Sequence, residues 1–83
     1  MTTKIHPHAK ARIEERGATE DEAIMTIEKG ESFPAKFNRT GFRHNFPFNS
    51  IRKGKTYNTK QVEAYAIKEN DDWIILTVIT KFF

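Results

Sequence analysis

The spacing of apolar residues changes once along this chain, and that change limits the folds open to it. Up to Gly30 the apolar residues follow helical spacing in two stretches, and each stretch ends at a glycine, Gly17 or Gly30. Beyond Gly30 they alternate with polar residues, which is typical of strands with one buried face. The sequence therefore predicts an α+β fold, with two short N-terminal helices packed on a mostly antiparallel four-stranded sheet.

Each predicted helix has its own start and stop signals. Pro7 suits a first helical turn, where its missing N–H costs nothing, and Gly17 is a typical residue just past a helix end. Thr19 and Glu22 have the spacing of a capping box at the start of the second helix, which Gly30 ends. The apolar residues expected to face the sheet are Ile5, Ala9, Ile13, Ala23, Ile24 and Ile27.

The second part of the chain predicts four strands, at residues 33–37, 42–48, 58–69 and 73–83. Pro34 confines the first to an edge or an irregular strand. In the second strand the aromatic residues alternate with Arg43, so they should face inward and Arg43 outward. Residues 49–55 are expected to form a basic loop, and residues 70–72 a hairpin turn. The last strand is apolar on both faces, as in a central strand.

Length and composition exclude several classes of function. Eighty-three residues suffice for one domain. The chain has no cysteine, so disulfides, thiol catalysis and cysteine-rich zinc sites are ruled out. Its longest apolar run, Trp73 to Leu76, is far below the ~20 residues that span a bilayer, and no secretory signal is visible. We expect a cytoplasmic protein with no membrane partner. His6, His8 and His44 lack the spacing of a metal site, so no metal or cofactor is predicted.

Charge is unevenly distributed along the sequence. The net charge is only +3, but no Asp or Glu occurs between Ser32 and Val62. The basic residues in that stretch are Lys36, Arg39, Arg43, Arg52, Lys53, Lys55 and Lys60. Such segregation favours a polyanionic partner, above all nucleic acid. The alternative is a solvated basic segment without a partner.

The first helix carries a basic flank formed by His8, Arg12 and Arg16 at intervals of four residues. Neighbouring guanidinium groups disfavour protonation of an imidazole, which leaves a neutral base suited to a ribose 2′-OH. An exposed helix face without a role is the alternative. The residues predicted to contact nucleic acid are Arg12, Arg16, Arg39, Arg52, Lys53 and Lys55.

A second candidate set comprises Arg43, Lys60 and a threonine of the last strand, Thr77 or Thr80. Cations close to a phosphate stabilise the charge that develops on its oxygens without a metal. His44 shares its face with phenylalanines, which favours a core position over catalysis. The phenylalanine-rich basic stretch from Phe33 to Tyr57 could stack on bases as in single-strand binders, although most of these rings are expected in the core.

Several short motifs follow one another in an order known from a bacterial family. They are His8-Ala9, Arg16-Gly17, Thr19 to Glu22, Gly30, Phe42 to Phe48, Thr59 to Val62, Thr77 to Ile79 and the pair Phe82-Phe83. In these motifs the chain resembles a domain family of unknown function related to RelE/ParE-type toxins, within the barnase–EndoU–colicin–RelE nuclease-like group. The resemblance implies a RelE-like fold of two helices on a four-stranded antiparallel sheet.

This resemblance also implies an activity, namely metal-independent cleavage of RNA by attack of the 2′-OH on the adjacent phosphate. His8 would be the general acid or base, Arg43 and Lys60 would hold the phosphate, and Thr77 would orient it. Arg16 would be either a phosphate ligand or an anchor of the helix end. These four catalytic candidates should then converge in space, and an acidic antitoxin protein would be a potential partner.

The alternative function is non-catalytic. In that interpretation the chain is a module of phage or plasmid origin that binds a protein or a nucleic acid through its basic surface.

Overall fold

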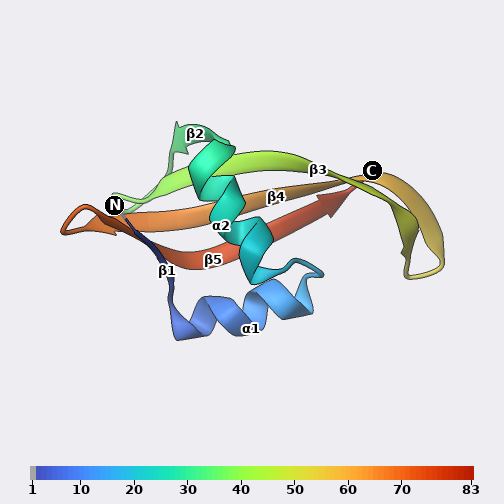
Figure 1. Ribbon diagram of the computed structural model, residues 1–83, viewed down its shortest axis with the longest axis horizontal. Helices are drawn as coiled ribbons and strands as arrows, with labels where there is room; N and C mark the ends of the chain where they lie inside the picture. The colour runs from blue at the N-terminus through green and yellow to red at the C-terminus, as the bar shows by residue number, and fades with distance from the viewer. Residues whose placement is uncertain (1) are drawn as a thin grey trace.

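The computed structural model describes residues 2–83 and has two helices packed on one face of a five-stranded mixed sheet (Figure 1). The elements in chain order are β1 (Thr3–Ile5), α1 (Pro7–Glu15), α2 (Glu20–Lys29), β2 (Glu31–Pro34), β3 (Thr40–Arg52), β4 (Lys55–Glu69) and β5 (Asp72–Phe82). The strands are ordered β1-β5-β4-β3-β2 across the sheet. The α+β class is as predicted.

Both helices begin and end where the local signals indicate. Pro7 opens α1, and Gly17 follows it with a φ of 77° that a residue with a Cβ rarely adopts. The capping box at the start of α2 is formed in both directions between Thr19 and Glu22. Gly30 lies so close to the carbonyl oxygens of Thr26 and Arg43 that a Cβ there would collide with them.

The sheet differs from the prediction in its number of strands. The fifth strand is β1, which pairs in parallel with β5 through three residues, from Thr3↔Trp73 to Ile5↔Ile75. Three residues are too few to produce a recognisable alternation, so the sequence did not reveal this strand. The expectation that residues 73–83 form the central strand is wrong as well, because β4 lies in the middle and β1 covers only the first part of β5.

The predicted basic loop at residues 49–55 is also wrong. Strands β3 and β4 continue through this region and meet at a tight turn in which Lys53 and Gly54 both have positive φ, 53° and 79°. Two such residues are typical of the type I′ turn that joins twisted strands. A register shift between Pro47 and Ser50 bends the hairpin. We call residues 49–57 the arm, which extends beyond the helices and curls at one end of the molecule (Figure 1).

The core lies between the helices and one sheet face and includes no residue of the arm. It consists of Ala9, Ile13, Ala18, Ala23, Ile27, Phe42, Val62, Ala64, Ala66, Ile75 and Val78. The alternation predicted for β4 is confirmed, since Val62, Ala64 and Ala66 are buried under the helices and Tyr65 lies on the opposite face. The molecule is elongated, with extents of 42 × 23 × 22 Å. Within residues 2–83, neither helix has the length and apolar character of a membrane span.

Candidate nucleic-acid interface

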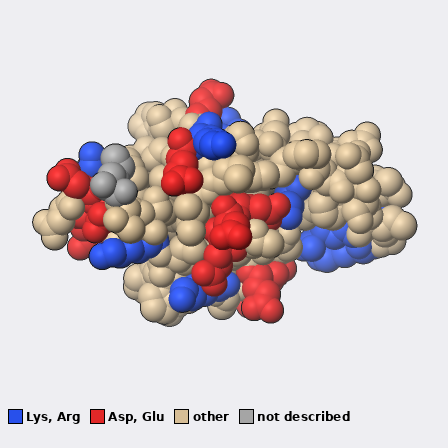
Figure 2. All heavy atoms as spheres, viewed as in Figure 1, with Lys and Arg blue, Asp and Glu red and all other residues tan. Residues whose placement is uncertain are grey.

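Acidic and basic side chains are unevenly spread over the surface. Figure 2 shows most acidic groups over the helices, with some basic groups among them, and a patch at the arm end that is basic only. The exposed acidic residues of the helices are Glu14, Glu15, Glu20, Asp21 and Glu28. The arm contains no acidic residue. The acidic excess belongs to α2, since α1 carries as many basic as acidic side chains, so a polyanion would be repelled chiefly by α2 and attracted to the arm.

The arm presents its cations together with aromatic rings. The guanidinium carbon of Arg52 lies 4.7 Å from the ring centroid of Phe82, which fixes the orientation of a cation that would otherwise be mobile. Lys53 is exposed in the turn, and Lys55 Nζ lies 5.9 Å from the ring of Tyr57. These three basic residues of the predicted nucleic-acid set lie within one hairpin tip. Arg39 is at the other end of β3, in the loop that follows β2.

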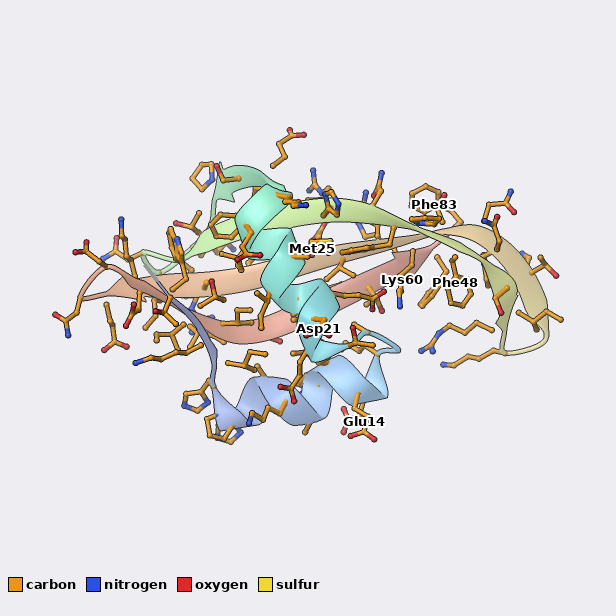
Figure 3. All side chains as sticks on the ribbon, in the orientation of Figure 1. Glu14, Asp21, Met25, Phe48, Lys60 and Phe83 are labelled. Carbon is orange, nitrogen blue, oxygen red and sulfur yellow. The ribbon has the colours of Figure 1, made fainter. Side chains whose placement is uncertain are left out.

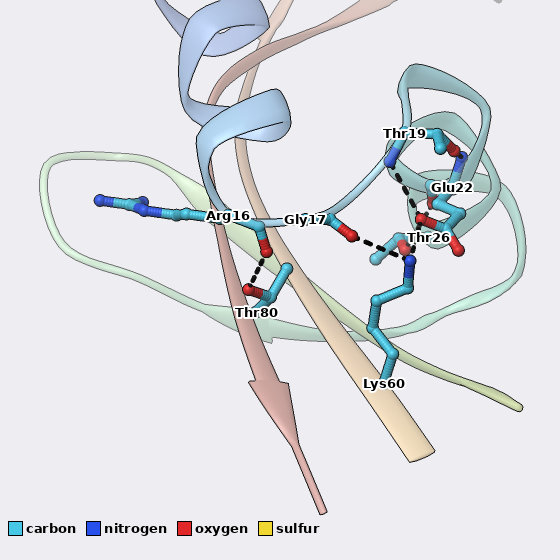
Figure 4. Close-up of polar contacts among 7 residues, drawn as sticks. All are labelled: Arg16, Gly17, Thr19, Glu22, Thr26, Lys60 and Thr80. Atoms are coloured by element: carbon cyan, nitrogen blue, oxygen red, sulfur yellow. Dashed lines mark hydrogen bonds and ion pairs between the residues drawn. The ribbon is translucent and has the colours of Figure 1, made fainter. Parts of the chain in front are cut away.

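Lys60 lies inside the molecule and has a structural partner (Figure 4). Its side chain points from β4 toward the start of α2, where Nζ donates to Glu22 Oε1 at 2.7 Å and to the Gly17 carbonyl at 3.0 Å. Only 7% of the residue is exposed. Figure 3 shows Lys60 beside Phe48, whose ring centroid is 5.7 Å from Nζ. Lys60 therefore ties the α1–α2 junction to the sheet, and its charge is already neutralised.

Arg16 is an anchor of the α1 end rather than a free cation. Its guanidinium donates to the carbonyl oxygen of Val78 in β5, and its own carbonyl accepts from the Thr80 hydroxyl at 2.6 Å (Figure 4). These contacts hold the last turn of α1 against β5. The sequence left two roles open for Arg16, a phosphate ligand or an anchor of the helix end. In the structure its contacts are those of the anchor.

The sheet face opposite the helices carries a charged cluster. We call this face the open face and define it by Arg43, Glu63, Tyr65, Thr77, Ile79 and Lys81. Within residues 2–83 no helix covers it. Glu63 Oε2 accepts from Arg43 Nε at 2.9 Å and lies 3.9 Å from Lys81 Nζ. Tyr65 donates its hydroxyl proton to Glu63 Oε1 at 3.1 Å. Thr77 lies opposite Tyr65 in the β4–β5 pairing.

The environment of Glu63 keeps its carboxylate ionised. Burial would raise its pKa, but hydrogen bonds from Arg43 and Tyr65 and the positive charges of Arg43 and Lys81 outweigh burial and lower the pKa. Burial raises the pKa of Tyr65, and its hydrogen bond to the Glu63 carboxylate raises it further. Glu63 therefore acts as an acceptor beside two cations, and the side chain of Arg43 stays partly exposed above the Phe33 ring.

The predicted convergence of His8, Arg43, Lys60 and Thr77 is wrong. Arg43 and Thr77 share the open face, but Lys60 lies on the helical side, because it is three residues from Glu63 along the same strand. His8 is exposed on α1, and its ring stacks on His6 with the centroids 5.2 Å apart. It lines a shallow hollow with Arg12, which pairs with Glu15 at 3.7 Å. The four residues therefore lie on two sides of the sheet: Arg43 and Thr77 on the open face, and Lys60 and His8 on the helical side.

A hollow at the edge of β3 brings together two other groups. β2 pairs with β3 only as far as Arg43, so the edge beyond it is free. There a hollow of about 360 Å³ is lined by Lys29, Glu31, Arg43, His44 and Asn45. His44 packs its ring edge-on to Phe46, yet it is only half-buried. The sequence favoured a core position for His44, because it shares its face with Phe42 and Phe46. Alternation along one strand does not reveal that β2 stops at Arg43, which leaves His44 at an open edge.

Comparisons with known proteins do not assign the chain to a family. No family model matches the chain, and neither a curated protein nor a solved structure matches it. The resemblance to RelE/ParE-type toxins thus remains a prediction. Within residues 2–83, no three histidine, aspartate or glutamate side chains lie close enough together to hold a metal ion.

Proposed function

We propose that this protein is a nucleic-acid-binding module, with RNA as its partner, and that the arm is its main contact surface. The observation that carries the proposal is the position of Arg52, Lys53 and Lys55 on a hairpin that extends away from the acidic helices. A two-stranded ribbon of this kind can follow a strand of nucleic acid or enter a groove. Its cations would contact phosphates, and Tyr57 and Phe82 would provide an aromatic surface beside them.

Salt dependence tests this proposal. Each phosphate neutralised on single-stranded RNA contributes about 0.7 to the slope of log affinity against log salt. Changing Arg52, Lys53 and Lys55 together to Gln should therefore reduce the slope by up to about 2. Changing Lys4, Lys10 and Lys68 to Gln lowers the net charge equally but outside the arm and the β3-edge hollow, and should leave the slope nearly unchanged. Equal effects of the two triple variants would argue against the arm as the contact surface.

Cleavage of RNA by 2′-OH transphosphorylation is a second candidate, favoured by the hollow that Arg43 and His44 share. His44 would accept the 2′-OH proton, the 2′-oxygen would bond to phosphorus, and the bond to the 5′-oxygen would break as that oxygen takes the proton back. Arg43 would neutralise the phosphate during this transfer, whereas Thr77 lies on β5, outside the hollow, and has no role in this candidate. The product would be a 2′,3′-cyclic phosphate.

An RNA cleavage assay in the presence of EDTA tests this second candidate. His44→Ala should lower the rate by about 100-fold or more if the imidazole transfers the proton. His8→Ala is the matched control, since it removes an exposed imidazole from α1, and should have little effect. A rate that falls with His8→Ala and persists with His44→Ala would instead support the assignment made from the sequence. If the wild-type protein forms no cyclic product, the cleavage candidate fails and nucleic-acid binding is the only proposed function that remains.

A further inference from the structure

Phe37 is the most exposed large apolar side chain of the described residues, with a relative accessibility of 83%. It lies in the loop between β2 and β3, and its φ of 60° is in the left-handed region. A bulky side chain is disfavoured there, because its Cβ approaches the following carbonyl oxygen. Asn38, which tolerates this conformation better, follows with the same φ. The loop thus presents a phenyl ring to solvent at a conformational cost.

The loop also holds the ring among cations. Arg39 lies with its guanidinium carbon 5.9 Å from the Phe37 ring centroid, and Lys36 precedes the ring in sequence. Two backbone hydrogen bonds close the loop, from Ala35 N to Arg39 O at 3.0 Å and from Arg39 N to Lys36 O at 3.2 Å. Both basic side chains belong to exposed residues. The surface therefore combines an aromatic face with positive charge on a defined turn.

Other phenylalanines of the basic stretch have structural partners. Phe42 is buried edge-on to Trp73, at 5.0 Å between centroids, and Phe48 packs on Phe82 at the same distance. Phe33 lies edge-on to Tyr65 at 6.0 Å, with Arg43 over its ring. Packing thus accounts for these rings but not for Phe37.

We propose that Phe37 stacks on an unpaired base of a single-stranded nucleic acid, with Lys36 and Arg39 on the flanking phosphates. This inference rests on the proposed nucleic-acid binding and names the kind of strand that is bound. Base stacking on aromatic side chains is tolerant of sequence and combines with cations along the backbone. A duplex offers no free base face away from its ends, so the ligand is single-stranded.

The position of the loop predicts how the strand runs. The Phe37 loop and the arm lie at opposite ends of β3, whose 13 residues span about 40 Å. A strand that contacts both would pass along β3 near Arg43, which is exposed between them. An oligonucleotide of about 16 nucleotides, the upper end of single-strand site sizes, is a suitable probe.

The test measures the affinity of such a single-stranded RNA and of its duplex by fluorescence anisotropy at several salt concentrations. Phe37→Ala should weaken single-strand binding by about 5- to 150-fold, the range expected for one stacked base. Phe37→Leu, which keeps an apolar side chain without a ring, should lose most of the same affinity, and Phe37→Tyr should keep it. Met25→Ala removes a half-exposed apolar side chain from the acidic helical side and is the matched control.

The salt dependence of the affinity distinguishes this inference from the proposed function. Stacking releases no counterions, so Phe37→Ala should lower affinity by the same factor at every salt concentration, whereas the arm variant should change the slope. If the arm variant weakens binding and Phe37→Ala does not, the stacking site is refuted while nucleic-acid binding stands. If Phe37→Leu binds like wild type, the contact is merely apolar and the inference fails. If the wild-type protein binds neither probe, both proposals are overturned.

Discussion

Arg43 and Lys60 show how the face of a strand decides what a cation can do. Lys60 points into the helical layer and is enclosed by Glu22 and the Gly17 carbonyl. Arg43 points to the open face, where Glu63 accepts from its Nε and the side chain stays partly exposed. The same charge is therefore structural in one position and available to a ligand in the other, because only the second keeps its contact with solvent.

At the residue scale, Glu63 should make stability dependent on pH in the acidic range. Its pKa is lower in the folded protein than its ordinary value of 4.5, so its contribution is complete above that pH and is lost as the pH falls through the folded pKa. Glu63→Gln should cost about 1 kcal/mol near neutral pH, a modest value because Arg43 and Lys81 are partly exposed. Urea unfolding should show the difference from wild type narrowing toward acidic pH.

The matched control for this prediction is Glu14→Gln, which changes an exposed carboxylate on α1. It should alter the free energy of unfolding little. A gap between wild type and Glu63→Gln that widens as the pH falls would contradict the assigned direction of the pKa shift.

A second residue-scale prediction concerns the left-handed backbone at Phe37. Phe37→Asn should raise the free energy of unfolding by about 0.5–1 kcal/mol, because Asn adopts positive φ more readily and only the exposed contact with Arg39 is lost. Urea unfolding would measure the gain. Phe37→Ala keeps a Cβ without such tolerance and should be close to neutral. A less stable Asn variant would show that the ring has a packing role.

At the scale of elements, the α1–α2 junction is joined to the sheet through its capping groups. Glu22 closes the capping box with Thr19 and also accepts from Lys60, so one carboxylate serves the helix start and the link to β4. Arg16 and Thr80 add the connection to β5. The helix ends are therefore part of the contact between layers.

Removing the ion pair between Lys60 and Glu22 should lower the free energy of unfolding. Lys60→Met removes the charge at similar side-chain volume and should lower the free energy of unfolding by about 1–3 kcal/mol, less than for a fully buried pair because Glu22 keeps its bond from Thr19. Combining it with Glu22→Gln should cost less than the sum of the two single changes, since the pair is coupled. Strictly additive losses in urea unfolding would indicate that the two side chains do not interact.

At the scale of the whole molecule, the chain divides into a packed body, which contains the core, and the arm. The buried core lies entirely outside residues 49–57. The arm contacts the body through Arg52, which lies over Phe82 and against Gly17, and through Tyr57, which also packs on Phe82. Stability and nucleic-acid contact are therefore assigned to different parts of the chain, and they can be separated by shortening the hairpin.

Replacing residues 51–56 with Asn-Gly should leave a folded protein. The dipeptide forms a type I′ turn and would directly follow the existing pair Ser50↔Tyr57. The loss of the Arg52–Phe82 contact should cost about 1 kcal/mol, while RNA affinity should fall sharply, because three cations are removed. Thermal unfolding followed by circular dichroism, together with the binding assay, checks both parts. A shortened protein that binds RNA as tightly as the wild type would refute the role of the arm.

The sequence alone determined the features that depend on local chain geometry. Pro7, Gly17, Thr19 and Gly30 placed the helix ends, because capping and positive φ involve only neighbouring residues. Alternation assigned the two faces of β4 and the outward position of Arg43, since side chains follow a period of two. The segregation of basic from acidic residues could likewise be read directly, and it motivates the proposed RNA partner.

The tertiary structure alone decided which residues meet. The parallel pairing of β1 with β5, the burial of Lys60 and the hollow shared by Arg43 and His44 depend on contacts between segments far apart in the chain. A period of two says that Arg43 and Phe42 face opposite ways, but not which face the helices cover or where a neighbouring strand stops. Local geometry constrains each residue singly, whereas a site needs several residues from different elements on one side of the same layer.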